Sequence, residues 1–345
     1  MNSKKPINIS LPLFNFVGVG GSVTHKTLSG TPKVINDSTE QGIKIAQYAN
    51  PDAFITPLQL FDLMENSRGV VVIGTLDPTK LDTQIKGSFT MWRDDYSASE
   101  GVYEFDGMAN TAEQMETILS TFGVEQDTII VIYASNDHHD AARLWWQIKL
   151  LGHKDVRYLD GGLNAWISAG YPTGNTNPTV EATVYKAPNP ITNTLATFDD
   201  VVAVLNDSST VIVDTRSQDE ERGVAILSGS SGPGKIFGAE WISWRKSNRE
   251  DTTLKSFSEL KEIYGHLEGK KVITYCQLGF RSAHTLLVLT QVLGIDNVQN
   301  YDGSWIEWSY QHYIKNNPSA VIENGQWKVL FTKKWAWFKS ANLVW

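Results

Sequence analysis

The sequence predicts an α/β protein made of two tandem domains, each a mostly parallel sheet covered by helices on both faces. With 345 residues, 41% hydrophobic and 20% charged, the chain is long enough for two globular domains. Segment 158–166 recurs as 300–308, an offset of 142 residues (302 − 160). In both halves apolar strand-like runs alternate with helical runs, a pattern typical of parallel sheets buried on both faces.

The second repeat has the clearer succession of elements. In order, we expect a strand at 210–213, a helix at 257–264, a central strand at 271–275, a buried helix at 282–293 and a strand at 298–301. Ser256 or Ser258 is the expected N-cap of the first helix. The repeat is far longer than the roughly 20–50 residues of a solenoid unit, so it indicates duplicated domains.

Changes in composition divide the chain into five expected segments. Residues 170–190 have the Pro, Gly and Asn content of a linker. The segments are an N-terminal extension (1–50), a first domain (51–170), a linker (171–195), a second domain (196–318) and an aromatic C-terminal extension (319–345). Residues 323–325, Glu-Asn-Gly between two apolar runs, predict a hairpin in the last segment. That segment either packs on its own domain, which we favour, or marks an interface.

Charge and cysteine content exclude several classes of protein. A net charge of −8 and a pI near 5.4 argue against nucleic acid as the main partner. One cysteine excludes an internal disulfide framework and any Cys-rich metal site. No apolar run reaches the roughly 18 residues of a membrane span. Residues 9–19 resemble a signal peptide, but Pro12, Asn15 and Gly18 interrupt them, which favours a cytoplasmic protein over a periplasmic or exported one.

The single cysteine, Cys276, is the main candidate for catalysis. It follows the strand at 271–275, and a short loop then leads through Arg281 into a helix. At a helix N-terminus, free N–H groups and the helix dipole favour an anion and lower the pKa of a thiol. The alternative is an inert buried thiol. Gly279, which permits a tight loop, and the charge of Arg281 favour a reactive thiol.

These residues resemble a known family. The Cys276 loop, His284 and the segments 293–294 and 301–308 are similar to the rhodanese (thiosulfate sulfurtransferase) superfamily. Four residues separate Cys276 from Arg281, whereas the cell-cycle phosphatases that share this fold have five. The shorter loop forms a smaller cradle, which suits a single sulfur atom better than a phosphoryl group and disfavours a phosphatase.

The resemblance implies sulfane-sulfur transfer from thiosulfate, through a persulfide on Cys276, to cyanide, a small thiol or a protein thiol, with no cofactor. Arg281 would bind the donor's sulfonate, and the loop amides would hold the persulfide. The implied substrate-binding residues are Arg281, Gln277, Leu278, Gly279, Phe280 and Ser282. A non-catalytic persulfide carrier for a partner protein is the alternative. 3-Mercaptopyruvate fits less well as donor, because its enzymes tend to have a Cys-Gly-Ser-Gly-Val-Thr loop.

The first repeat lacks this chemistry. The 142-residue offset places Ala134 opposite Cys276 and His139 opposite Arg281. The resemblance implies an inactive first domain that packs on the active second one, with the site in the cleft between them. His138 and His139 are adjacent and rarely converge on one ion, so we expect no metal and interpret residues 138–140 as a solvated polar loop.

Three residues of the second repeat are expected to support the site. Asp214 and Arg216 form an Asp-x-Arg run after the first strand, and a structural ion pair is favoured over a contact of Arg216 with an anionic donor. Lys235 stands where the resembling family has a histidine, so the details of its loop differ from the family pattern.

Overall fold

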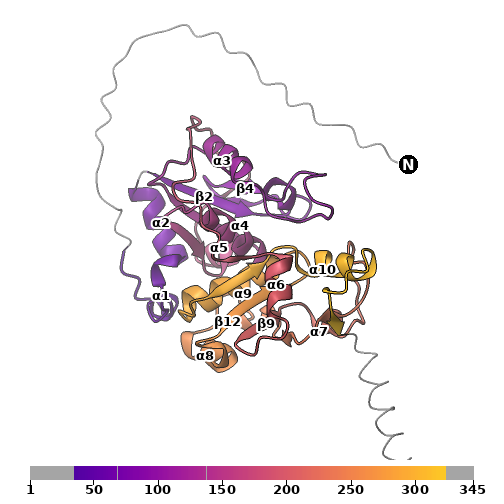
Figure 1. Cartoon of the computed structure of the whole chain (residues 1–345). Coiled ribbons are helices and arrows are strands. Elements are labelled where there is room, and N and C mark those ends of the chain that lie inside the picture. The colour runs from indigo at the N-terminus through magenta and orange to yellow at the C-terminus, as the bar shows by residue number, and fades with distance from the viewer. Residues whose placement is uncertain (1–34, 68, 137, 324–345) are drawn as a thin grey trace, which may run out of the picture. The chain divides into compact units, whose positions relative to one another are not determined.

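The computed structural model describes residues 35–67, 69–136 and 138–323 (Figure 1). Up to residue 174 the elements are α1 (Glu40–Ile45), η1 (Pro51–Ala53), β1 (Phe54–Ile55), α2 (Pro57–Asn66), β2 (Val70–Thr75), β3 (Gln84–Ile85), β4 (Phe89–Met91), η2 (Arg93–Tyr96), α3 (Ala112–Thr121), β5 (Ile129–Ala134), α4 (His138–Leu150), β6 (Val156–Leu159), α5 (Gly162–Ser168) and β7 (Thr173–Gly174).

The second repeat follows the same order. Its elements are β8 (Leu195–Ala196), α6 (Phe198–Val204), β9 (Thr210–Asp214), α7 (Gln218–Glu221), β10 (Lys235–Ile236), β11 (Glu240–Trp241), η3 (Trp244–Ser247), α8 (Phe257–Tyr264), η4 (Gly265–Leu267), β12 (Lys271–Tyr275), α9 (Phe280–Leu287), η5 (Val288–Val292, a π-helical turn), β13 (Val298–Tyr301), α10 (Ser304–Tyr313) and β14 (Ile322–Glu323).

Each repeat forms a five-stranded sheet in which all paired strands run parallel. The order β4-β2-β5-β6-β1 in the first repeat is matched by β11-β9-β12-β13-β8 in the second. A short antiparallel pair accompanies each sheet, β3 with β7 and β10 with β14. The duplication in the sequence is thus a duplication of the topology, and the predicted fold class is confirmed.

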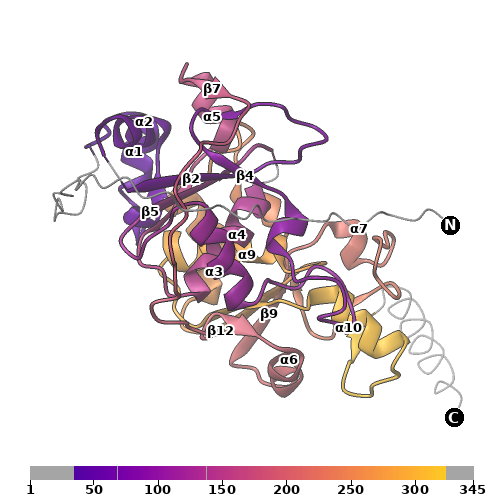
Figure 2. The same ribbon diagram turned by 90° about the horizontal axis from the view of Figure 1, so that it is seen from above.

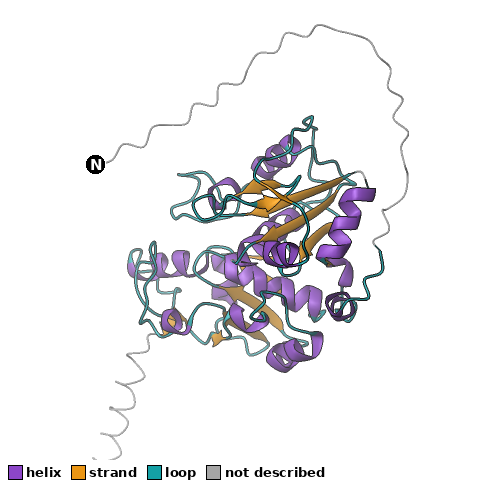
Figure 3. Cartoon of the chain, turned by 180° about the vertical axis from the view of Figure 1, so that it is seen from behind, coloured by secondary structure: helices purple, strands orange, loops and turns teal. Residues whose placement is uncertain are grey.

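Alternation along the central strands places core residues on both faces of each sheet. In β5, Ile130 and Ile132 pack toward α3 and α4, whereas Ile129 and Val131 pack toward α2 and α5. The second sheet is covered in the same way, by α8 and α9 on one face and by α6 and α10 on the other. Figure 3 shows the two sheets with helices around them. Both faces of β5 are covered along its whole length, which accounts for its continuous apolar sequence.

The two repeats share one hydrophobic core. α4 lies beside α9 (Figure 2). The side chains of both helices belong to the same buried cluster. His284 on α9 lies in this interface, 5.2 Å from the ring of Trp244 and 6.4 Å from that of Tyr158. Within the described residues neither ring nitrogen of His284 has a hydrogen-bond partner.

Local predictions agree closely with the structure in the second repeat. The helix at 257–264 and the strands at 271–275 and 298–301 are found as expected, with Ser256 as the N-cap. The helix after Cys276 begins at Phe280, two residues earlier than predicted, because Gly279 turns the chain with a φ of +75°. Its last turn is π-helical.

The expectation of a solvated loop at residues 138–140 was wrong. His138, His139 and Asp140 are buried in the first turn of α4. His139 packs on Trp244 of the second repeat with a centroid distance of 4.7 Å. Asp140 pairs with Arg93 through two nitrogen–oxygen contacts of 2.8 and 3.0 Å. Asp140 is satisfied by Arg93 and Tyr96 of its own repeat, whereas His139 is covered by Trp244 of the second repeat. The local sequence does not reveal either set of contacts.

The segments outside the two sheets are partly docked on them. Lys44 of α1 contacts Asp160 at 2.7 Å, which ties residues from the N-terminal extension to the first repeat. In the linker, the hydroxyl of Tyr185 lies 3.0 Å from His153 Nδ1. The signal-like run at 9–19 lies outside the described residues. So do residues 324–345, which hold the turn and second run of the expected hairpin and most of the aromatic extension, whose packing therefore stays a prediction. The described residues include no helix long and apolar enough to cross a membrane.

We predict a pH dependence of stability that arises from His284. Burial, reinforced by the charges of His138 and His139, holds its pKa well below the ordinary 6.5. Below that pH the unfolded chain takes up a proton that folded His284 does not, so this part of the stability is present above pH 6.5 and is lost as the pH falls. Urea unfolding of the wild type at a series of pH values from neutral to mildly acidic should show the decline. The His284→Phe variant should show a shallower one, and an equal slope would contradict the assignment.

Candidate active site around Cys276

Cys276 lies at the carboxyl end of the central strand β12, where ligands bind in open parallel sheets. Only 1% of the surface of Cys276 is exposed to solvent. The main-chain N–H of Cys276 donates to the hydroxyl of Ser304 at 3.1 Å, and its carbonyl accepts from the N–H of Trp305 at 3.0 Å. The backbone of the nucleophile candidate is therefore fixed by the start of α10.

The surroundings of the sulfur favour a thiolate. Burial is the largest single influence and acts to raise the pKa of Cys276. The charge of Arg281, together with hydrogen bonds from the amide and hydroxyl of Ser282 and the amide of Leu278, outweighs burial and holds the pKa below its ordinary value. The Ser282 hydroxyl lies 3.6 Å from the sulfur. If a second sulfur were attached to Cys276, its negative charge would be stabilised by these same donors.

Gly279 determines the tight shape of the loop. Its φ of +75° lies in the left-handed region, and a Cβ at this position would stand 2.6 Å from Nη1 of Arg143. The carbonyl of Gly279 accepts hydrogen bonds from Asn300 at 3.0 Å and from Arg143 at 3.3 Å. The loop thus closes around the sulfur and is anchored from behind by two buried side chains.

Ser304 is a second anchor, and sequence reasoning missed it. Its φ of +48° is unusual for a residue with a side chain, and the first repeat has Gly162 at the equivalent position, with a φ of +53°. The Ser304 hydroxyl donates to the carbonyl of Tyr301 at 2.7 Å and accepts from the amide of Cys276. A non-glycine residue in this region costs about 1–3 kcal/mol, which these two hydrogen bonds offset.

Arg281 lies beside Cys276, as expected, but its guanidinium is engaged. Nη1 and Nη2 donate to the two carboxylate oxygens of Glu220 at 2.7 and 2.8 Å. Glu220 is only 4% exposed and comes from α7, 61 residues earlier in the chain. Arg281 was expected from the sequence to bind the donor's sulfonate. In the structure its two terminal nitrogens are already bound to the carboxylate of Glu220.

The supporting residues predicted from sequence are also paired. Arg216 donates from Nη2 to Asp214 at 2.6 Å and to the carbonyl of Gly234 at 2.8 Å. The Tyr275 hydroxyl donates to the same carboxylate at 2.7 Å. This buried network joins the ends of β9 and β12 and has the geometry of a structural tie. Lys235 contacts Glu221 at 3.0 Å and Glu323 at 3.6 Å.

The remaining loop residues predicted to contact substrate occupy different positions. Gln277 is buried, and its amide nitrogen donates to the Ser230 hydroxyl at 2.6 Å, so it braces the loop. Phe280 is buried among core residues of both repeats. Leu278 is half-buried and lies against the first repeat, where a Cβ at Gly107 would stand 2.8 Å from its Cδ2.

Arg143 of α4 is the main residue that sequence reasoning missed. It is fully buried, comes from the repeat without the cysteine, and donates to the carbonyls of Gly279 and of Gly107, the latter at 3.1 Å. It also contacts the carboxylate of Asp302, and its guanidinium carbon lies 4.9 Å from the ring of Phe280. Arg143 therefore connects the Cys276 loop, the turn before α10 and a loop of the first repeat.

The two repeats exchange loops across their interface. In each repeat a loop closes with an antiparallel bridge, between Ser97 and Ala109 in the first and between Asn248 and Leu254 in the second. The amide of Ala109 donates to Asp302 at 2.9 Å, and that of Leu254 donates to Asp160 at 2.7 Å. The loop that reaches the Cys276 side is the longer of the two, which brings side chains of the first repeat to the second.

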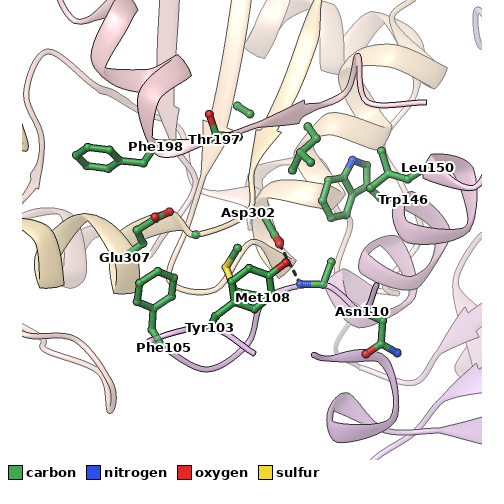
Figure 4. Close-up of a pocket in the computed structure, with 14 residues that line it drawn as sticks. Tyr103, Phe105, Met108, Asn110, Trp146, Leu150, Thr197, Phe198, Asp302 and Glu307 are labelled. Carbon is green, nitrogen blue, oxygen red and sulfur yellow. Dashed lines mark hydrogen bonds between the residues drawn. The ribbon is translucent and has the colours of Figure 1, made fainter. Parts of the chain in front are cut away.

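A pocket of about 330 Å³ lies beside this contact (Figure 4). Figure 4 shows Tyr103, Phe105 and Met108 of the first repeat on one side, with Phe198 and Glu307 of the second repeat across from them. Cys276 is not among the residues that line this pocket.

No metal site is formed by the described side chains: no group of three or more His, Cys, Asp or Glu residues within them could hold an ion. His139, placed opposite Arg281 by the repeat, instead lies 3.1 Å from Nη2 of Arg93.

Comparison with known proteins identifies relatives over both repeats. The model of the rhodanese-like domain matches residues 58–169 and 197–311. A protein of Saccharopolyspora erythraea named "Putative thiosulfate sulfurtransferase" is 38% identical over 205 residues, 57% of this chain and 72% of that protein. The "Sulfur carrier protein TtuD" of Thermus thermophilus is 34% identical over 208 residues, 57% of this chain and 73% of that protein.

Solved structures share the fold at lower identity. The crystal structure of YnjE aligns with a TM-score of 0.68 and 24% identity over 81% of this chain and 70% of that one. An EanB variant in complex with ergothioneine aligns with a TM-score of 0.70 and 20% identity over 80% of this chain and 71% of that one. These likenesses extend to the tandem arrangement of the two repeats.

We predict that Arg281 lowers the pKa of the Cys276 thiol. Removal of its charge in Arg281→Met leaves burial as the dominant influence, so the midpoint of thiolate formation should rise above the ordinary value of 9.0. Arg281→Lys retains a charge and should stay closer to the wild type. Because Cys276 is the only cysteine, the rate of its alkylation by iodoacetamide against pH reports on this thiol alone. An unchanged midpoint in Arg281→Met would refute the role.

We also predict that Arg143 holds the Cys276 loop in place. Arg143→Lys retains a charge opposite Asp302 but cannot reach the carbonyls of Gly279 and Gly107 together, which should cost about 1–3 kcal/mol of unfolding free energy. The loosened loop should make Cys276 react faster with iodoacetamide at a pH where it is ionised. Arg157→Lys is the matched control, because buried Arg157 pairs with Asp155 within the first repeat. Equal alkylation rates in the two variants would argue against the assignment.

Proposed function

Because the chain belongs to the rhodanese-like family, we propose that it transfers sulfane sulfur from a donor such as thiosulfate, through a persulfide on Cys276, to a thiol or to cyanide. The observation that carries this proposal is the single buried thiol at the end of β12, with a lowered pKa and two loop amides directed at its sulfur. We assign the reaction to the second domain, residues 196–318.

The first half-reaction forms the persulfide. The Cys276 thiolate attacks the outer sulfur of the donor, a sulfur–sulfur bond forms to Cys276, and the sulfur–sulfur bond of thiosulfate breaks with its electron pair leaving on sulfite. In the second half-reaction the acceptor thiolate or cyanide attacks the outer sulfur of the persulfide. The Cys276 thiolate is then released, and electrons and atoms balance without a cofactor.

Main-chain amides and positioning residues of the chain would assist both half-reactions. The amides of Leu278 and Ser282 hold the charge of the thiolate, and after the first step they lie near the terminal sulfur of the persulfide. Ser304 and Arg143 act as positioning residues, because they fix the backbone of Cys276 and of Gly279. The first repeat, with Ala134 in place of a thiol, contributes packing and contacts rather than a second nucleophile.

A second candidate is a persulfide carrier that delivers its sulfur to one docked protein. The name of the Thermus relative raises this reading, and exposed apolar residues near the site favour it. Val224, Ile226 and Leu227 are 75%, 55% and 42% exposed. They directly precede Ser228, whose carbonyl lies 3.4 Å from the Gln277 amide nitrogen. An apolar surface beside the Cys loop suits a protein acceptor.

The proposal predicts a gain of one sulfur atom on Cys276. Intact-protein mass spectrometry after incubation with thiosulfate should show this addition in the wild type and not in Cys276→Ser, which should also lose thiocyanate formation from cyanide. The variant should stay folded, with an unfolding free energy within about 2 kcal/mol of the wild type. Thiocyanate formation by the folded variant would rule out Cys276 as the nucleophile.

The same measurements separate enzyme from carrier. Steady turnover of thiosulfate with cyanide or a small thiol supports the enzyme. One sulfur added per chain without turnover supports the carrier.

A further inference from the structure

Three basic residues of the second repeat that were candidates to support or bind an anionic donor are already paired with carboxylates. Arg281 pairs with Glu220, Arg216 with Asp214, and Lys235 with Glu221 and Glu323. An anionic donor that approaches the sulfur therefore meets ion pairs, and the Arg281 pair is the one that stands next to the thiol.

Glu220 is held firmly in this pair. Its carboxylate takes both terminal nitrogens of Arg281 in a bidentate contact, the geometry that carboxylates and guanidinium groups prefer. One of its oxygens also accepts from the amide and the hydroxyl of Ser217, at 3.1 and 2.8 Å, in a capping box at the start of α7. Although burial opposes ionisation, Arg281 and Ser217 hold the pKa of Glu220 below its ordinary value, so the carboxylate is charged at neutral pH.

We propose that Glu220 determines donor specificity: by occupying the fork of Arg281, it makes the site discriminate against dianionic donors such as thiosulfate and accept sulfane-sulfur donors with a single negative charge, such as organic persulfides and thiosulfonates. This inference rests on the proposed sulfur transfer through Cys276. A sulfonate can take the two terminal nitrogens of Arg281 together only by displacing Glu220, and at any other edge of the guanidinium its second charge still lies close to that carboxylate.

The apolar side of the site supports an organic donor. Leu278 is half-buried in the loop and faces Gly107 of the first repeat. An organic group attached to the donor sulfur finds apolar surface there, whereas a sulfonate gains nothing from it. With a thiosulfonate, the Cys276 thiolate takes the outer sulfur, and a monoanionic sulfinate leaves with the electron pair of the broken sulfur–sulfur bond.

The test compares two donors that differ by one charge, thiosulfate and methanethiosulfonate. Glu220→Gln is nearly isosteric, removes the negative charge and leaves part of the Arg281 fork free. It should lower the KM for thiosulfate roughly tenfold, the effect of about one charge-assisted hydrogen bond gained, and should change the KM for methanethiosulfonate much less. A gain in affinity cannot result from a damaged fold.

Asp219→Asn is the matched control. It removes the same charge from the neighbouring, exposed position of α7, whereas the two terminal nitrogens of Arg281 bind Glu220. Its donor preference should equal that of the wild type. An unchanged preference in Glu220→Gln, or an equal shift in Asp219→Asn, would overturn the inference.

A measurement on the wild type alone adds a test that needs no variant. Sulfate and methanesulfonate are unreactive analogues with two charges and one, and methanesulfonate should inhibit at least as strongly as sulfate. Stronger inhibition by sulfate would contradict the inference while leaving sulfur transfer intact. If neither donor adds sulfur to Cys276 in the wild type, the proposed function itself fails, and the specificity inference fails with it.

Discussion

The contact of α4 with α9 is the interaction on which the rest of the structure depends. It merges the cores of the two repeats into one buried cluster. α9 begins at the end of the Cys276 loop, so the packing that joins the repeats also sets the direction from which the loop is supported. Because such cores are densely packed, a small shift of α4 would be transmitted to the loop.

This packing explains why a repeat without a nucleophile is retained beside one with it. Arg143 passes from α4 into the second repeat and binds the carbonyl of Gly279, while Asp302 receives the amide of Ala109 from the first repeat. Buried polar groups must find partners, and here the two repeats supply partners for each other. The second repeat alone would leave Asp302 without the guanidinium that pairs with it and Gly279 without one of its two donors.

The electrostatics of the site also depend on which charged side chains are paired with each other. Arg281 is close enough to Cys276 to stabilise a thiolate, yet its terminal nitrogens donate their hydrogen bonds to Glu220. In the proposed reaction, stabilisation of the Cys276 thiolate and recognition of the donor would therefore be separable roles of Arg281, and the pairing with Glu220 would limit the second. The positive charge of Arg281 acts on the thiolate through space, whereas hydrogen bonds from its two terminal nitrogens require direct contact. A carboxylate partner therefore weakens the electrostatic effect on the thiolate and blocks direct binding of an anion to those nitrogens.

The features that depend on near neighbours could be predicted from the amino-acid sequence. They are the duplication, the apolar strands, the capped helix at Phe257–Tyr264 and the placement of Cys276 between β12 and α9. Periodicity, capping and the glycine turn act over a few residues, so they can be read along the chain. Only the tertiary structure decided which charges meet. Arg281 and Glu220 are 61 residues apart, and Arg143 and Gly279 are 136 apart. The burial of Asp140 likewise depends on Arg93 and Tyr96, 47 and 44 residues earlier in the chain, and that of His139 on Trp244 of the other repeat.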